Sequence, residues 1–125
     1  MEFIHAPKAC ASVGPYSHCV KAGSTYYLCG QVPFHPVTGE VVGNGMKEQA
    51  VQTLANMKAV LEAAGLAVTD IAKTTVFVTN MDDFAAFNEV YAAFMGEHRP
   101  ARVCVGVSNI AHGCLLEMDA ICFKE

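Results

Sequence analysis

Apolar residues recur with helical spacing in two stretches of the chain. Over residues 46–64 the apolar positions advance in steps of four, three, four and three, which predicts an amphipathic helix capped at its C-terminus by Gly65. A second stripe advances in steps of three, four and three, and we expect Asp82 or Asp83 to begin this helix and Gly96 to end it. The second stripe consists of Phe84, Phe87, Tyr91 and Phe94.

Segments rich in β-branched residues predict five strands around these helices. Two short strands lie within residues 20–30, a third covers residues 72–79, and the last two cover residues 102–107 and 115–123. We expect the loop 108–113 to join the last two strands as a hairpin. The order β-β-α-β-α-β-β predicts one α+β domain over residues 1–125, with two helices on one face of a mixed sheet.

The predicted strands are apolar on both faces. In the strand at 72–79, Thr74, Val76 and Val78 lie on one face, and Thr75, Phe77 and Thr79 lie on the other. Charged residues make up only 16% of the chain, against about 25% in an ordinary soluble domain. Because two helices cover one face of a sheet, we expect a partner to bury the other face, most simply a second copy of the chain.

Charge and cysteine content exclude several classes of protein. The net charge is −4 and the eight basic residues are scattered, which argues against nucleic acid and against a membrane surface as partners. The chain lacks a secretory signal pattern and an 18-residue apolar run, so we expect a cytoplasmic protein with reduced thiols. The five histidines are far apart in the sequence, and we expect no metal site.

Two charged residues in the charge-poor C-terminal part are candidates for chemistry. Arg102 begins an apolar strand, where a guanidinium can grip a carboxylate with two hydrogen bonds; it can equally lie in solvent or pair with Glu97. Glu117 can face a half-buried pocket or be an edge-strand carboxylate that maintains solubility. In a hairpin, an even loop would put Glu117 on the face of Arg102 and Cys104, and an odd loop would separate them.

Four further residues are candidates for ligand contacts. Tyr16 follows a Gly-Pro pair that would hold it on a rigid turn, although it can also be an ordinary surface tyrosine. Gly30 ends a strand, where its N–H can face an anion or simply terminate pairing. Asn88 lies on the second helical stripe, and Cys104 is flanked by valines with no nearby histidine that would activate its thiol.

Taken together, these motifs resemble one family. The pattern resembles the reactive intermediate deaminase A family, also called the YjgF or Rid family, over nearly the whole chain. Its most specific part is the Pro-Ala-Arg strand followed by the glutamate at 117. The ordered motifs are Gly14-Pro15-Tyr16-Ser17, Gly30-Gln31, Thr38-Gly39-Glu40, Gln49, Asn56, Ala63-Ala64-Gly65, Lys73-Thr74-Thr75-Val76-Phe77, Phe84, Asn88-Glu89-Val90-Tyr91, Pro100-Ala101-Arg102 and Leu116-Glu117.

The resemblance implies a chorismate-mutase-like fold and a homotrimer whose sheets face inward and whose active sites lie between subunits. It also implies hydrolysis of reactive enamine and imine intermediates, of the 2-aminoacrylate and 2-iminopropionate type, to 2-oxo acids and ammonia. No cofactor or metal is implied. Alternative functions are a metabolite-binding, regulatory or chaperone-like module and, less in keeping with the acidic composition, a ribonuclease or translation inhibitor.

By the same resemblance, Arg102 would hold the substrate carboxylate and Glu117 would orient or activate the attacking water. Backbone groups at Gly30 and Cys104 would complete the cradle, and Tyr16 from an adjacent subunit would close it. Asn88 would line or brace the pocket.

Two features depart from the family pattern. Cys29 stands where the family often has a serine, which would change the contact with substrate because a thiol is a poor hydrogen-bond donor. The segment 96–99 lacks the aromatic residue often found before the proline, so we expect a more open cleft.

Overall fold

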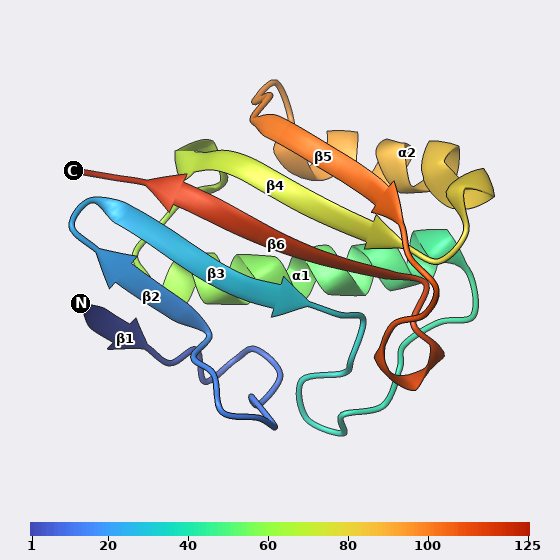
Figure 1. Cartoon of the computed structure of the whole chain (residues 1–125), viewed down its shortest axis with the longest axis horizontal. Coiled ribbons are helices and arrows are strands. Elements are labelled where there is room, and N and C mark those ends of the chain that lie inside the picture. Colours follow the sequence, from blue (N-terminus) through green and yellow to red (C-terminus); the bar gives the residue numbers. More distant parts are fainter.

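The computed structural model describes residues 1–125 and has two helices packed on one face of a six-stranded sheet (Figure 1). The α+β architecture is therefore confirmed, with one strand more than predicted, because the N-terminal residues pair with the second strand. The elements are β1 (Glu2–Ile4), β2 (Cys19–Ala22), β3 (Thr25–Gln31), α1 (Met46–Ala63), β4 (Ile71–Val78), α2 (Phe84–Met95), β5 (Ala101–Gly106) and β6 (Leu116–Phe123).

The strand order β1-β2-β3-β6-β4-β5 contradicts the predicted hairpin between the last two strands. The strand β6 lies between β3 and β4 and is antiparallel to both, whereas β5 is at the edge of the sheet and parallel to β4. The physical reason is the helix between them: β4, α2 and β5 form a crossover unit, which places its two strands side by side and parallel. The predicted hairpin of β2 and β3 is confirmed.

The first helix has the predicted C-terminal cap. Gly65 has φ 73°, a left-handed conformation that glycine adopts without steric cost. The next amide, from Leu66, donates back to the Leu61 carbonyl at 2.8 Å, which satisfies one of the orphan carbonyls at the helix end. The buried face of α1, which includes Leu54, Met57 and Leu61, packs on the sheet in a core cluster of 22 residues.

Asp83, one of the two predicted residues, occupies the N-cap position of α2, but the capping hydrogen bond near the start of this helix comes from another residue. A short 3-10 turn (Met81–Asp83) precedes the helix, and its cap is Asn80, whose Oδ1 accepts a hydrogen bond from the Asp82 amide at 2.9 Å. Asp83 makes no capping hydrogen bond with its side chain. An amide oxygen one turn earlier thus replaces the expected carboxylate. Gly96, with φ 63°, ends the helix as predicted.

The sheet face opposite the helices is open in the single chain. Its side chains include Tyr27, Val103 and Val105, which are 49%, 45% and 40% exposed. Strand pairing places them on one face with Phe77 and Ile121, and this mainly apolar face also carries Lys73, Glu117 and Asp119. The predicted uncovered sheet face is therefore confirmed. Neither helix is long and apolar enough to cross a membrane.

Candidate active site

The predicted site residues fall into two groups on opposite faces of the sheet. Arg102 lies level with Thr74 of β4, and Thr74 is fully buried under the helices. Glu117 lies level with Phe77, and Phe77 is level with Val105 on the open face. Because directly paired residues share a face, one chain does not bring Arg102 and Glu117 together. Of the two alternatives, Arg102 and Glu117 are therefore on separate faces of the sheet. Their faces are set by the pairing of β5 and of β6 with β4, which lies between them.

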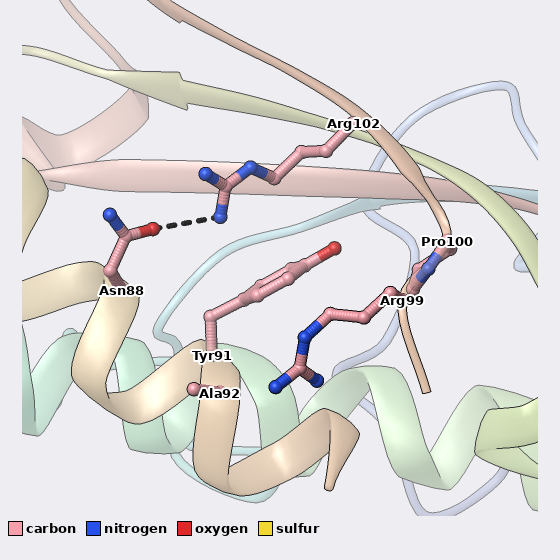
Figure 2. Close-up of a pocket in the computed structure, with 6 residues that line it drawn as sticks. All are labelled: Asn88, Tyr91, Ala92, Arg99, Pro100 and Arg102. Carbon is pink, nitrogen blue, oxygen red and sulfur yellow. Dashed lines mark hydrogen bonds between the residues drawn. The ribbon is translucent and has the colours of Figure 1, made fainter. Parts of the chain in front are cut away.

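On the helix face, Arg102 is held by α2. Its Nη1 donates to Asn88 Oδ1 at 2.8 Å (Figure 2). Its guanidinium carbon lies 4.8 Å from the centre of the Tyr91 ring and 5.2 Å from that of the Phe84 ring. These aromatic faces attract the cation. The only ion pair in the chain joins Lys47 to Glu89 on the surface, so the alternative pairing of Arg102 with Glu97 is wrong.

A buried hydrogen bond fixes the ring beneath Arg102. The Tyr91 and Thr74 hydroxyls are 2.8 Å apart, and both residues are buried. This bond ties α2 to β4 directly under the arginine. The contact of Tyr91 and Phe84 with Arg102 was not predicted from the sequence, where both residues belong to the apolar stripe of the second helix. Their spacing with Asn88 on one helix was the available signal, because residues three and four apart share a helix face.

A cavity of about 470 Å³ opens beside Arg102. Its lining comes from α2 and from the turn before β5, and it includes Asn88, Tyr91 and a second arginine, Arg99. Arg99 was not among the predicted residues. Cys104, two residues after Arg102 on the same strand face, packs against the core rather than lining this cavity.

On the other side of the sheet, Glu117 lines a second cavity of about 400 Å³ with Tyr16, Cys29 and Gly30. The Glu117 carboxylate approaches the backbone so closely that a Cβ on Gly30 would overlap its Oε2 and lie 3.0 Å from its Cδ. Burial raises the pKa of Glu117 above its ordinary value of 4.5, and the like charge of Asp119 raises it further. His112 also lines this cavity and was not predicted to do so.

Tyr16 reaches this cavity from the N-terminal loop. Its amide donates to the Gly14 carbonyl at 2.9 Å, which closes the turn expected from the Gly-Pro pair. The loop is anchored by buried His18, whose Nδ1 accepts from the Ala6 amide at 3.0 Å while Nε2 donates to the Cys10 carbonyl at 2.7 Å. One chain therefore places Tyr16 and Glu117 in the lining of the same cavity.

The thiols near the two cavities are poorly suited to act as nucleophiles. Burial raises the pKa of Cys104, and the nearby Arg102 charge opposes this only in part. Burial also raises the pKa of Cys29, whose sulfur accepts a hydrogen bond from Gln31 Nε2 at 3.1 Å. The thiolate is the reactive form, so both groups favour the unreactive thiol. No three His, Cys, Asp or Glu side chains gather in a way that would hold a metal ion.

Comparisons with known proteins place these features in context. The model of the endoribonuclease L-PSP family matches residues 5–124 of the chain. A RutC family protein of Pyrococcus horikoshii is 47% identical, with 99% of this chain and 98% of the relative covered. A relative from Escherichia coli, named “Putative reactive intermediate deaminase TdcF”, is 41% identical, again with 99% and 98% covered.

Solved structures show the same fold. The crystal structure of E. coli TdcF with bound serine matches with a TM-score of 0.94 at 41% identity, covering 100% of both chains. The structure of the YjgF gene product from E. coli also gives a TM-score of 0.94, at 42% identity and with 100% of both chains covered. The similarity therefore extends over the complete arrangement of sheet and helices that positions both cavities.

Proposed function

The chain belongs to the endoribonuclease L-PSP family, which includes the YjgF and RidA proteins, and we propose that it is a deaminase of reactive 2-imino acids. The products would be the 2-oxo acid and ammonia, and the substrates would be of the 2-iminopropionate and 2-iminobutanoate type. The deaminase name of TdcF supports this reaction class. The serine bound in the TdcF structure, an amino acid with a free carboxylate, supports a ligand of this chemistry.

The observation that carries this proposal is Arg102, a half-buried guanidinium without an acidic partner. It makes a single hydrogen bond to protein, to Asn88, out of the five N–H donors of a guanidinium. A planar carboxylate fits such a fork with two parallel hydrogen bonds. The aromatic rings beneath it hold the fork in place without neutralising its charge.

Glu117 is the group proposed to activate water. No hydrogen bond to protein occupies its carboxylate, which lies against the backbone of Gly30. As a base, it would take a proton from water while the oxygen adds to the imine carbon, and the C=N bond becomes a C–N single bond. Glu117 would return this proton to the nitrogen. Movement of the hydroxyl proton to the amine would then break the C–N bond, releasing ammonia and leaving the C=O of the 2-oxo acid. An imine is already electrophilic, so positioning would supply much of the effect.

Because Arg102 and Glu117 lie on opposite faces of one sheet, we propose that each complete site forms between two copies of the chain. The open apolar face, with Tyr27, Val103 and Val105, is the surface that such copies would bury. The proposed assembly is a homotrimer, with Arg102 and Asn88 from one subunit and Glu117 and Tyr16 from the next. We also propose that the protein works in the cytoplasm, that it needs no cofactor, and that it binds neither nucleic acid nor a membrane.

The direct test couples the protein to a serine or threonine dehydratase, which releases the imine, and measures the rate of ammonia and 2-oxo acid formation. Wild-type protein should accelerate both, and Arg102→Ala should remove most of the acceleration while the circular dichroism spectrum stays unchanged. Arg102→Lys keeps the charge but not the fork, so it should recover only part of the activity. Wild-type activity in Arg102→Ala would contradict the assigned role. Binding of pyruvate without any acceleration would favour the metabolite-binding alternative.

A further inference from the structure

The chain has only two arginines, and both line the same cavity. The cavity beside Arg102 has a volume of about 470 Å³ and is formed by six residues. None of them is acidic, although the protein as a whole has a net charge of −4. The lining consists of Asn88, Tyr91, Ala92, Arg99, Pro100 and Arg102. A positive cavity in a negative protein indicates an anionic ligand.

Arg99 is held in place at the end of α2. Its Nη1 donates to the Gly96 carbonyl at 2.6 Å and to the His98 carbonyl at 2.9 Å. Those bonds satisfy carbonyls at the helix end, where a cation is favourable. They use one nitrogen only, and no protein acceptor takes the donors on Nη2 and Nε. These two bonds orient the exposed Arg99 side chain and leave one edge of its guanidinium available.

The two arginines are suited to one ligand with two anionic ends. In Figure 2 the Tyr91 side chain is drawn between the guanidinium groups of Arg99 and Arg102, and all three residues line the same cavity. A monocarboxylate on Arg102 would leave the charge of Arg99 unpaired. A dianion spanning the cavity would pair both, and charge-assisted hydrogen bonds are about twice as strong as neutral ones.

We propose that this cavity selects 2-imino acids whose side chain carries a second anionic group, a carboxylate or a phosphate. Arg102 binds the carboxylate next to the imine carbon, and Arg99 binds the second anion. This inference rests on the proposed deaminase function and narrows its substrate class. Arg99 occupies the segment where the sequence lacks the family's aromatic residue, so the selectivity belongs to this chain.

Binding of unreactive 2-hydroxy acids tests the inference without depending on turnover. Isothermal titration calorimetry would compare lactate with malate, and glycerate with 3-phosphoglycerate, on the wild-type protein. We expect malate or 3-phosphoglycerate to bind at least about tenfold more tightly than its monoanionic counterpart. Whichever of malate and 3-phosphoglycerate shows the preference over its monoanionic counterpart identifies the second anion as a carboxylate or a phosphate.

Variants of Arg99 assign the effect to its side chain. Arg99→Gln should remove the preference for the dianion by weakening malate or 3-phosphoglycerate binding far more than lactate binding, whereas Arg99→Lys should retain part of the preference. Lys58→Gln is the matched control, because it removes the same charge from an exposed position of α1 outside the cavity and should change nothing.

Equal affinity for lactate and malate, together with equal affinity for glycerate and 3-phosphoglycerate, would overturn the selectivity while leaving the deaminase proposal intact. An unchanged dianion preference in Arg99→Gln would overturn the role of Arg99. No binding of any of the four acids would contradict both this inference and the proposed carboxylate site on Arg102.

Discussion

At the scale of single residues, the Glu117 side chain packs against the backbone of Gly30. The carboxylate occupies the volume that a side chain on residue 30 would need. Both residues were predicted from the sequence to belong to the site, Gly30 through its backbone and Glu117 through its action on water, but their direct packing was not predicted. Their contact depends on the pairing of β3 with β6, where the register shifts between Leu28 and Gln31, and such an irregularity has no sequence pattern of its own.

Gly30→Ala should therefore reduce activity. The new methyl group displaces the Glu117 carboxylate, and a displacement of about 1 Å can lower kcat/KM by about a hundredfold. Gly45→Ala is the matched control, because a Cβ there meets nothing within 4 Å and its φ of −121° suits alanine. The dehydratase-coupled assay measures both variants. Equal activity in Gly30→Ala and wild type would show that the position of Glu117 is not critical.

The raised pKa of Glu117 predicts the acid limb of the pH–rate profile. The proposed base must be ionised, so kcat/KM should fall as pH decreases through a value above the ordinary 4.5 of a glutamate. The negative charge of Asp119 contributes to this raised pKa, and Asp119→Asn should therefore lower it and shift the limb to lower pH. Profiles measured from about pH 4 to about pH 8 would show the shift. A limb that stays in place, or moves upward, contradicts the assignment of Glu117.

At the scale of elements, α2 links the core to the Arg102 cavity. It presents Asn88 and Tyr91 to Arg102, and the hydroxyl pair of Tyr91 and Thr74 attaches it to the sheet. The periodicity of apolar residues was sufficient to predict both helices and the central strands, because each pattern reports which side of an element is buried. It does not report which strands are neighbours. The α2 crossover was the signal that β5 pairs with β4, and the expectation of a C-terminal hairpin overlooked it.

The hydroxyl pair can be measured with a double-mutant cycle. Tyr91→Phe leaves a buried Thr74 hydroxyl without its partner and should cost about 1–2 kcal/mol of unfolding free energy. Thr74→Val should cost a similar amount, and the double variant should cost less than the sum of the two. Urea unfolding at one fixed chain concentration gives the three values. Additive costs would mean that the hydroxyls do not stabilise each other.

At the scale of the whole molecule, the low content of charged residues is reflected in one surface, the face of the sheet that carries exposed Tyr27, Val103 and Val105. The helices cover one face of the sheet, and the other face remains apolar and exposed in the single chain. Sequence composition predicted that such a face exists and strand alternation predicted where it lies. Whether the residues of the site share that face was not predictable, because it depends on pairing across β4 between strands distant in sequence.

Val103→Asp should disrupt the proposed assembly. Val103 is 45% exposed on the open face, and an aspartate there would be buried without a partner when copies associate. Light scattering should show a change from three times the 13.3 kDa chain mass to a single chain, with loss of activity. Val51→Asp, at a 58% exposed position on α1, should leave the mass unchanged. A trimer that persists in Val103→Asp would place the interface elsewhere.

The position of Arg102 and Glu117 on opposite faces has a genetic consequence. If each site takes Arg102 from one subunit and Glu117 from the adjacent subunit, two inactive variants can complement each other. Co-expressed Arg102→Ala and Glu117→Ala chains should recover activity at about one interface in four when subunits mix at random, whereas each variant alone stays inactive. No recovery in verified mixed oligomers would contradict the shared site. A cell carrying both defective alleles would then make a working enzyme that neither allele encodes.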